Sequence, residues 1–198
     1  DAKFFYEEDL KHPLESYIEK LDKVVFQESL GTVRQKAERL EKLADALSVD
    51  AQLSAADAAD AQRAARLCKA DLVTNAVIEF TSVQGVMGSY YAAASGETPQ
   101  VAQAIGQHYQ PRFAGDALPD TTVGKLVALA DKLDTICGLF AVGQGPTGSS
   151  DPFALRRSAI GIVNIPVFAR TVRASVISAK GLEYVANARS VGVKTGAI

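Results

Sequence analysis

Apolar residues recur at three- and four-residue spacing over residues 123–142, and this pattern predicts one long helix of about five turns. The residues that share its apolar face are Leu126, Leu129, Ala130, Leu133, Ile136, Cys137 and Phe140. Ala128, Asp131 and Thr135 lie roughly opposite this stripe, where small side chains would let a second helix approach closely. Asp131 is therefore either a working carboxylate in a cleft or a carboxylate that is solvated or paired between helices.

Further stretches with helical periodicity surround this segment, and together they predict an all-helical domain. One helix is expected to start at Thr32, because Thr32 and Gln35 have the spacing of a capping box, and to run to about residue 47. A loop is expected over residues 48–60, and another helix over about residues 55–80. Two more helix starts are expected where a capping residue precedes proline, at Thr98 with Pro99 and at Asp151 with Pro152. No strand-like alternation persists before the last residues of the chain.

Composition restricts the class of protein further. With 198 residues, of which 47% are hydrophobic and 22% charged, the chain can bury a core and does not have the composition of a disordered or membrane-spanning protein. Its two cysteines, Cys68 and Cys137, lack a paired spacing and lie on apolar helical faces, which indicates reduced, structural thiols in the cytoplasm. The acidic start without an initiator methionine suggests a piece of a longer protein without a signal peptide.

Charge is distributed unevenly along the chain. The formal net charge is −2, yet residues 152–198 hold seven basic side chains and Glu183 as their single acidic one. A basic end on an acidic body suits an anionic partner. An ordinary solvated tail explains the same charges equally well.

Few residues have the pattern of a catalytic or metal site. The two histidines, His12 and His108, have no partner at metal-ligand spacing, so no zinc site is expected and His108 is expected at the surface or the boundary of the core. The glycine-rich residues 143–148 lack the lysine of a phosphate-binding loop, and no G-x-S-x-G elbow is present. No catalytic residue is assigned.

Basic and aromatic residues on two connecting segments suit contact with RNA. Tyr109, Arg112 and Phe113 lie on an irregular connector, and such an aromatic–arginine–aromatic group can stack on bases. Arg156 and Arg157 follow the expected cap at Asp151 as a cationic pair that can grip phosphate oxygens. The same residues can also pin a loop to the core or solvate a helix.

Several long motifs follow one another along residues 1–165: D-A-K-F-F at 1–5, V-V-F-Q-E-S-L-G-T at 24–32, C-K-A-D-L-V-T-N at 68–75, E-F-T-S-V-Q-G-V-M-G at 79–88, H-Y-Q-P-R-F-A-G-D at 108–116, L-A-D-K-L-D-T at 129–135 and D-P-F-A-L-R-R at 151–157. In this order they resemble the beta subunit of bacterial two-subunit (α2β2) glycyl-tRNA synthetase. Residues 166–198 carry no such motif and form a separate basic C-terminal segment.

The resemblance implies that residues 1–165 form an HD-domain-like helical bundle, similar to HD-type phosphohydrolases. Such enzymes hold a metal with an early histidine, a His-Asp pair and a later aspartate; here Asp71 matches the aspartate of the pair and Asp131 the later one. Ala70 stands where the paired histidine should be, and residues 32–47 contain no histidine. The resemblance therefore implies vestigial HD positions at Asp71 and Asp131 without a metal, and Asp131 is expected to be a polar contact between helices with a basic neighbour.

The resemblance also implies a function. In that family the alpha subunit carries the adenylation and glycyl-transfer site, which uses ATP with Mg, while the beta subunit is needed for tRNA binding. This piece of glycine–tRNA ligase, a class II aminoacyl-tRNA synthetase, would then be inactive alone and help to bind tRNA(Gly) beside the alpha subunit, with no DNA or membrane partner and no cofactor of its own. The residues expected to face the RNA, from charge and placement, are Arg112, Lys132, Arg156, Arg157 and Lys69.

Two alternatives to this function stay open from the sequence. One is a structural module that packs against the alpha subunit or the rest of the beta subunit without touching RNA. The other is a residual metal-dependent phosphohydrolase that uses Asp71 and Asp131.

Overall fold

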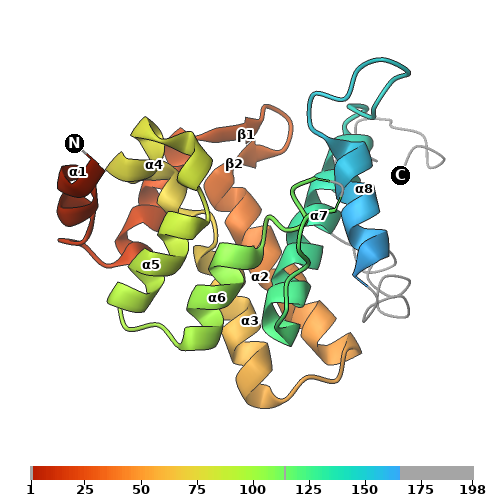
Figure 1. The fold of residues 1–198 in the computed structure, drawn as a ribbon. Coiled ribbons are helices and arrows are strands. Elements are labelled where there is room, and N and C mark those ends of the chain that lie inside the picture. Colours follow the sequence, from red (N-terminus) through yellow and green to blue (C-terminus); the bar gives the residue numbers. More distant parts are fainter. Residues whose placement is uncertain (1, 114, 166–198) are drawn as a thin grey trace.

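The computed structural model describes residues 2–113 and 115–165, and these form a mostly helical domain (Figure 1). Predictions for the basic segment 166–198 lie outside the described residues. The elements in chain order are α1 (Ala2–Asp9), the 3₁₀ helix η1 (Leu14–Lys23), β1 (Val25–Gln27), β2 (Gly31–Thr32), α2 (Val33–Asp50), α3 (Ala55–Leu67), the 3₁₀ helix η2 (Ala70–Val73), α4 (Asn75–Glu79), the 3₁₀ helix η3 (Thr81–Val83), α5 (Val86–Ala94), α6 (Pro99–Gln107), α7 (Thr122–Ala141) and α8 (Leu155–Asn164).

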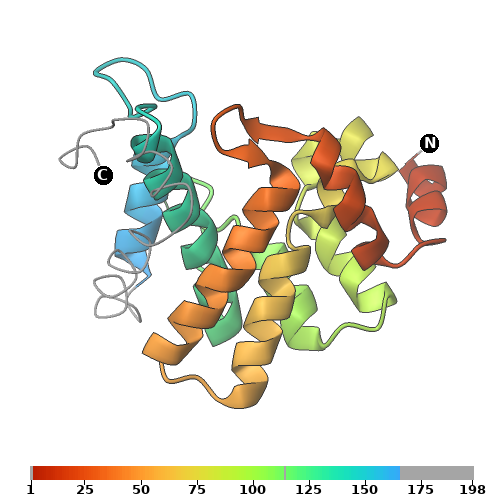
Figure 2. The same cartoon turned by 180° about the vertical axis from the view of Figure 1, so that it is seen from behind.

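The central helix α7 confirms the prediction for residues 123–142. It begins after Thr121, whose hydroxyl accepts a hydrogen bond from the Gly124 N–H at 2.9 Å. Figures 1 and 2 show α7 between α2 and α8, and it also packs on α3 and α6. Because helices contact α7 on several sides, Ala128 is as fully buried as Leu126, Leu129 and Ala130 of the apolar stripe, whereas Phe140 at the end of the stripe is 42% exposed. The side of α7 opposite the stripe is therefore covered, as the prediction of a second helix there requires.

Helix α2 begins with the predicted capping box. The Thr32 hydroxyl accepts from the Gln35 N–H, and the Gln35 side chain accepts from the Thr32 N–H at 2.9 Å. The helix continues beyond its expected end near residue 47 to Asp50, and the Ala51 N–H that follows still donates to the Leu47 carbonyl at 2.9 Å. The prediction of a loop over residues 48–60 is wrong in its extent, because only a short turn separates α2 from α3.

The single helix expected over residues 55–80 is also wrong, because α3, η2 and α4 are three separate pieces. Polar side chains bind the backbone at the breaks and so compete with a continuous helix. The Thr74 hydroxyl donates to the Asp71 carbonyl at 2.7 Å. The Asp9 carboxylate, which is 1% exposed, accepts from the Asn75 and Ala76 N–H groups at 2.9 Å each and so caps α4.

A small antiparallel hairpin departs from the all-α prediction. It pairs β1 with β2 and joins η1 to α2. Gly31 adopts a φ of +83° where the second strand starts, a conformation that glycine permits. The strands are too short to show alternation in the sequence, so the pattern of residues 23–31 indicates only a short apolar passage.

Helix α8 starts three residues later than the sequence predicts, although Asp151 does cap it. The Asp151 carboxylate accepts from the Leu155 N–H at 2.7 Å and from the Arg156 N–H at 3.0 Å. Helix α8 packs beside α7 through Gly161, where a Cβ atom would lie 2.7 Å from Cε of Lys132. Among the described residues, no helix combines the length and the apolar character needed to cross a membrane.

Candidate functional site

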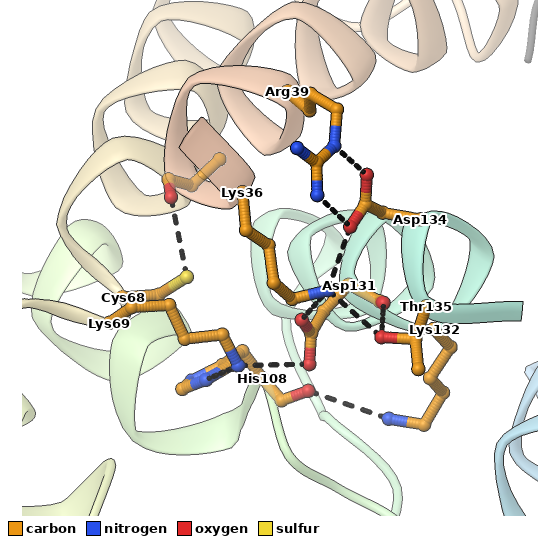
Figure 3. A network of polar contacts seen from close by, with 10 residues as sticks. Lys36, Arg39, Cys68, Lys69, His108, Asp131, Lys132, Asp134 and Thr135 are labelled. Carbon is orange, nitrogen blue, oxygen red and sulfur yellow. Dashed lines mark hydrogen bonds and ion pairs between the residues drawn. The ribbon is translucent and has the colours of Figure 1, made fainter. Parts of the chain in front are cut away.

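Asp131 of α7 lies between two lysine ammonium groups in the interior of the domain (Figure 3). Its Oδ2 accepts from Nζ of Lys69 at 3.0 Å, and its Oδ1 lies 3.2 Å from Nζ of Lys36 on α2. The Asp131 residue is 8% exposed and both lysines are less exposed still. The predicted contact of Asp131 with a basic neighbour is therefore confirmed, with two neighbours in place of one.

A second carboxylate, Asp134, lies one helical turn further along α7. It accepts from Nζ of Lys36 at 2.8 Å and from Nε of Arg39 at 2.7 Å. Lys36 also donates to the Thr135 hydroxyl at 2.9 Å, and that hydroxyl donates to the Asp131 carbonyl at 2.7 Å. Lys36 thus joins both carboxylates, and each buried charge has partners of the opposite sign, which buried charges require.

His108, at the end of α6, completes the network around Lys69. Its Nε2 lies 2.9 Å from Nζ of Lys69, and its Nδ1 lies 2.6 Å from the Ile105 carbonyl. Burial and the Lys69 charge hold the pKa of His108 well below its ordinary value, so the imidazole is neutral and its Nε2 accepts from the ammonium. The sequence prediction of a surface or boundary histidine is wrong, since His108 is fully buried.

The charges of this network persist at neutral pH. Burial alone would raise the pKa of Asp131, but the Lys69 and Lys36 ammonium groups outweigh burial and hold that pKa well below its ordinary value. Burial would lower the pKa of Lys69, but the Asp131 carboxylate, together with smaller contributions from neighbouring groups, holds that pKa above its ordinary value. Asp131 and Lys69 therefore form an ion pair.

Asp71, which the resemblance paired with Asp131, has different partners. Its Oδ2 accepts from the Gly85 N–H at 2.6 Å and the Gly88 N–H at 3.0 Å, at the start of α5. A Cβ atom at Gly88 would lie 3.0 Å from that oxygen, so glycine allows this close approach. Burial raises the pKa of Asp71. Asp71 thus anchors α5 and shares no hydrogen bond with Asp131.

The residues around Asp131 do not fit a metal centre. Oδ2 accepts a hydrogen bond from one ammonium group and Oδ1 lies 3.2 Å from another, and their positive charge opposes a metal cation at the same place. The imidazole of His108 is held by Lys69 on one nitrogen and a carbonyl on the other. Within residues 2–113 and 115–165, no three His, Cys, Asp or Glu side chains gather in a way that could hold a metal ion.

Three of the five predicted RNA-facing residues line one surface pocket of about 380 Å³: Arg112, Lys132 and Arg157. Lys132 points away from the Asp131 network and donates to the Gln110 carbonyl at 2.7 Å. It also donates to the His108 carbonyl, the contact that Figure 3 shows. Burial lowers the pKa of Lys132 to about 8. Arg157 of α8 donates from Nη1 to the Arg112 carbonyl at 3.0 Å.

The other two predicted residues lie apart from this pocket. Arg156 donates to the Thr147 and Gly148 carbonyls of the loop between α7 and α8. Lys69 is 4% exposed and engaged by Asp131 and His108, so it is the least accessible of the five. RNA contact by any of the five stays a prediction.

Sequence reasoning missed Lys36, Arg39 and Asp134, although the sequence holds a signal for Lys36. It lies three residues after Val33 and four before Leu40, on the inward face of α2. A charged residue on an inward face needs a partner, and Asp131 and Asp134 are the carboxylates of α7.

The fold and the site define a helical domain with a lysine-bound carboxylate at its centre and a cationic pocket on its surface. The chain belongs to the glycyl-tRNA synthetase beta subunit family, whose model matches residues 1–185 and confirms the resemblance. It is 52% identical over 165 residues to a "Glycine--tRNA ligase beta subunit" of Trichodesmium erythraeum, covering 83% of this chain and 23% of that relative. The identity to the same-named subunit of Moorella thermoacetica is 54% over 167 residues, 84% of this chain and 24% of the relative. The chain thus spans about a quarter of the length of these curated relatives.

Replacing Asp131 by asparagine tests the ion network. The substitution leaves buried ammonium groups without their counter-charge, so we expect the free energy of unfolding at pH 7 to fall by about 3 kcal/mol. Because the pKa of Asp131 is below that of an unfolded aspartate, its stabilisation is complete above about pH 4 and is lost as the pH falls. Urea unfolding should therefore show the gap between wild type and Asp131→Asn narrowing at pH 3.

The matched control is Asp50→Asn, at the exposed end of α2, with an expected change within about 0.5 kcal/mol. Equal stability of the two variants at pH 7 would show that the network does not stabilise the fold.

Proposed function

We propose that this chain is a part of the beta subunit of glycyl-tRNA synthetase that helps to bind and position tRNA(Gly) and performs no covalent step itself. The family match and the relatives named glycine–tRNA ligase beta subunit support the assignment. The whole enzyme would join glycine to tRNA in the cytoplasm with ATP and Mg, and the alpha subunit would be the partner that carries that chemistry.

The single observation that supports the non-catalytic role is that lysine ammonium groups lie against both carboxylate oxygens of Asp131. We infer that residues 1–165 are an HD-like bundle in which the ammonium groups of Lys36 and Lys69 stand where an HD enzyme would hold its metal. An ammonium group supplies positive charge for the fold but cannot activate a bound water as a metal does. A phosphohydrolase function of Asp71 and Asp131 is therefore not favoured.

The RNA-binding role is supported by the gathering of Arg112, Lys132 and Arg157 around one pocket. Asp131 also lines this pocket, but its charge is already balanced by Lys36 and Lys69. The pocket thus presents a surplus of positive charge to a phosphate backbone, which dominates the affinity of proteins for nucleic acids. A structural packing module would not need this surplus.

A salt titration of tRNA(Gly) binding tests the RNA-binding role. Alanine at Arg112, Arg156 or Arg157 should weaken binding and flatten the slope of log K against log salt by about one unit for each phosphate that the variant no longer neutralises. Fluorescence anisotropy of a labelled transcript measures both quantities. The control is Lys3→Ala, since Lys3 is exposed on α1 at the opposite end of the molecule from α8 (Figures 1 and 2).

Affinity that is indifferent to salt and to all three arginines would favour the structural packing module instead. An equal loss of affinity on Lys3→Ala would show that binding is spread over the whole surface.

Two assays of this chain alone test its predicted lack of catalysis. Glycine-dependent exchange between ATP and pyrophosphate should be absent, and the purified chain should hydrolyse no nucleotide in Mn²⁺ and carry no stoichiometric metal. Exchange activity would contradict the assignment of chemistry to the alpha subunit. One bound metal per chain, lost in Asp131→Asn, would instead support the phosphohydrolase function.

A further inference from the structure

A second hollow of about 730 Å³ adjoins the cationic pocket and differs from it in character. The two share Pro111, Arg112 and Arg157 as lining residues. The second hollow adds three exposed apolar side chains, Phe113, Leu118 and Ile160. A cationic hollow thus continues into an apolar one across the two shared arginines.

The connector that carries Arg112 and Phe113 is held at its backbone. The Asp116 carboxylate accepts from the Arg112 N–H at 2.6 Å, and Arg157 donates to the Arg112 carbonyl at 3.0 Å. Asp116 also accepts from the Ala117 N–H at 2.9 Å, so its charge is engaged within the connector. The backbone of Arg112 is therefore held on both its N–H and its carbonyl, and a backbone that is already held loses little entropy when a ligand binds.

The cationic groups keep donors for a ligand. Among the described residues, the Arg112 guanidinium makes no hydrogen bond, and one Nη1 contact leaves most of the five N–H donors of Arg157 free. The Lys132 ammonium has three protons, and the carbonyls of His108 and Gln110 accept two of them. These donors suit the oxygens of a phosphate, for which arginine offers bidentate contacts.

The aromatic side chains of the connector divide between core and surface. The Lys69 ammonium lies 4.0 Å from the centroid of the Tyr109 ring, which ties Tyr109 to the interior network. Phe113 is 62% exposed and lies beside the arginines in the second hollow. An exposed ring next to cations is the arrangement on which unpaired bases of RNA stack.

We propose that the two hollows together bind one unpaired nucleotide of an RNA, with its phosphate among Arg112, Lys132 and Arg157 and its base against Phe113. This inference rests on the proposed tRNA-binding function and deepens it. A duplex would offer the phosphate but keep its bases stacked inside the helix, so a single-stranded position of the RNA is required. Both hollows have the size of small-molecule sites, which span roughly 300–1,000 Å³.

Photocrosslinking tests the proposal directly. A tRNA(Gly) transcript made with 5-iodouridine is bound to the chain and irradiated, and the crosslinked peptide is identified by mass spectrometry. We expect a crosslink at Phe113, its loss in Phe113→Ala, and a roughly tenfold weaker affinity of that variant, because a stacked base contributes on the order of that factor.

Phe4→Ala is the matched control, since Phe4 is similarly exposed at 58% but lies on α1, away from the pocket. Because the Phe113 ring is exposed, its loss should leave the urea midpoint unchanged, which the same samples verify. A second arm, Phe113→Tyr, keeps a stacking ring and should retain both crosslink and affinity.

Each other outcome overturns a distinct part of the account. RNA binding with crosslinks elsewhere and an unaffected Phe113→Ala variant would refute the nucleotide pocket while leaving tRNA binding intact. No RNA binding at low salt would refute both. Binding of a mononucleotide such as AMP that tRNA does not displace would assign the pocket to a free nucleotide and refute its role in RNA recognition.

Discussion

The ion pair between Asp131 and Lys69, with Lys36 on the other carboxylate oxygen, is the interaction on which the arrangement of the domain depends. It joins α7 to α2 and to the segment that follows α3, and through His108 it reaches the end of α6. Charges buried this deeply are costly unless all of them are paired. The helices are therefore held in the one arrangement that brings these four side chains together.

Lys132, the residue after Asp131, links the buried network to the surface of the domain. Lys132 follows Asp131 on α7 but turns to the carbonyls of the connector, and α8 can approach Lys132 because residue 161 is glycine. The connector in turn presents Arg112 and Phe113 beside Arg157. One helix thus carries the buried network on one side and supports the proposed RNA pocket on the other. The Asp131 carboxylate is the counter-charge of Lys36 and Lys69 that fixes this scaffold.

Local sequence patterns predicted the parts of the fold whose causes are local. The periodicity of α7 and the capping box of Thr32 with Gln35 depend on residues a few positions apart, and both predictions are confirmed. The separate start of α4 was missed because the side chain that caps it is Asp9, which is 66 positions away from Asn75. The start of α8 was misplaced because Asp151 caps it from outside the helix.

The candidate site, like the fold, was predictable only where it does not depend on contacts between distant residues. The resemblance pointed to Asp131 and Asp71, and the lack of histidines predicted a basic neighbour in place of a metal. Which neighbours these are depends on pairings between residues 62 to 98 positions apart, such as Lys69 with Asp131 and Lys36 with Asp134. Burial of His108 likewise follows from its place beside Lys69, which no spacing in the sequence reveals.

The central claim, that Asp131 and Lys69 stabilise the domain as a mutually dependent pair, is tested most directly by a double-mutant cycle. The free energies of unfolding in urea are compared for wild type, Asp131→Asn, Lys69→Met and the double variant. We predict that each single change costs about 3 kcal/mol, because it strands a buried polar partner, and that the double variant loses at least about 1.5 kcal/mol less than the sum. Additive losses would contradict a coupled ion pair at the centre of the domain.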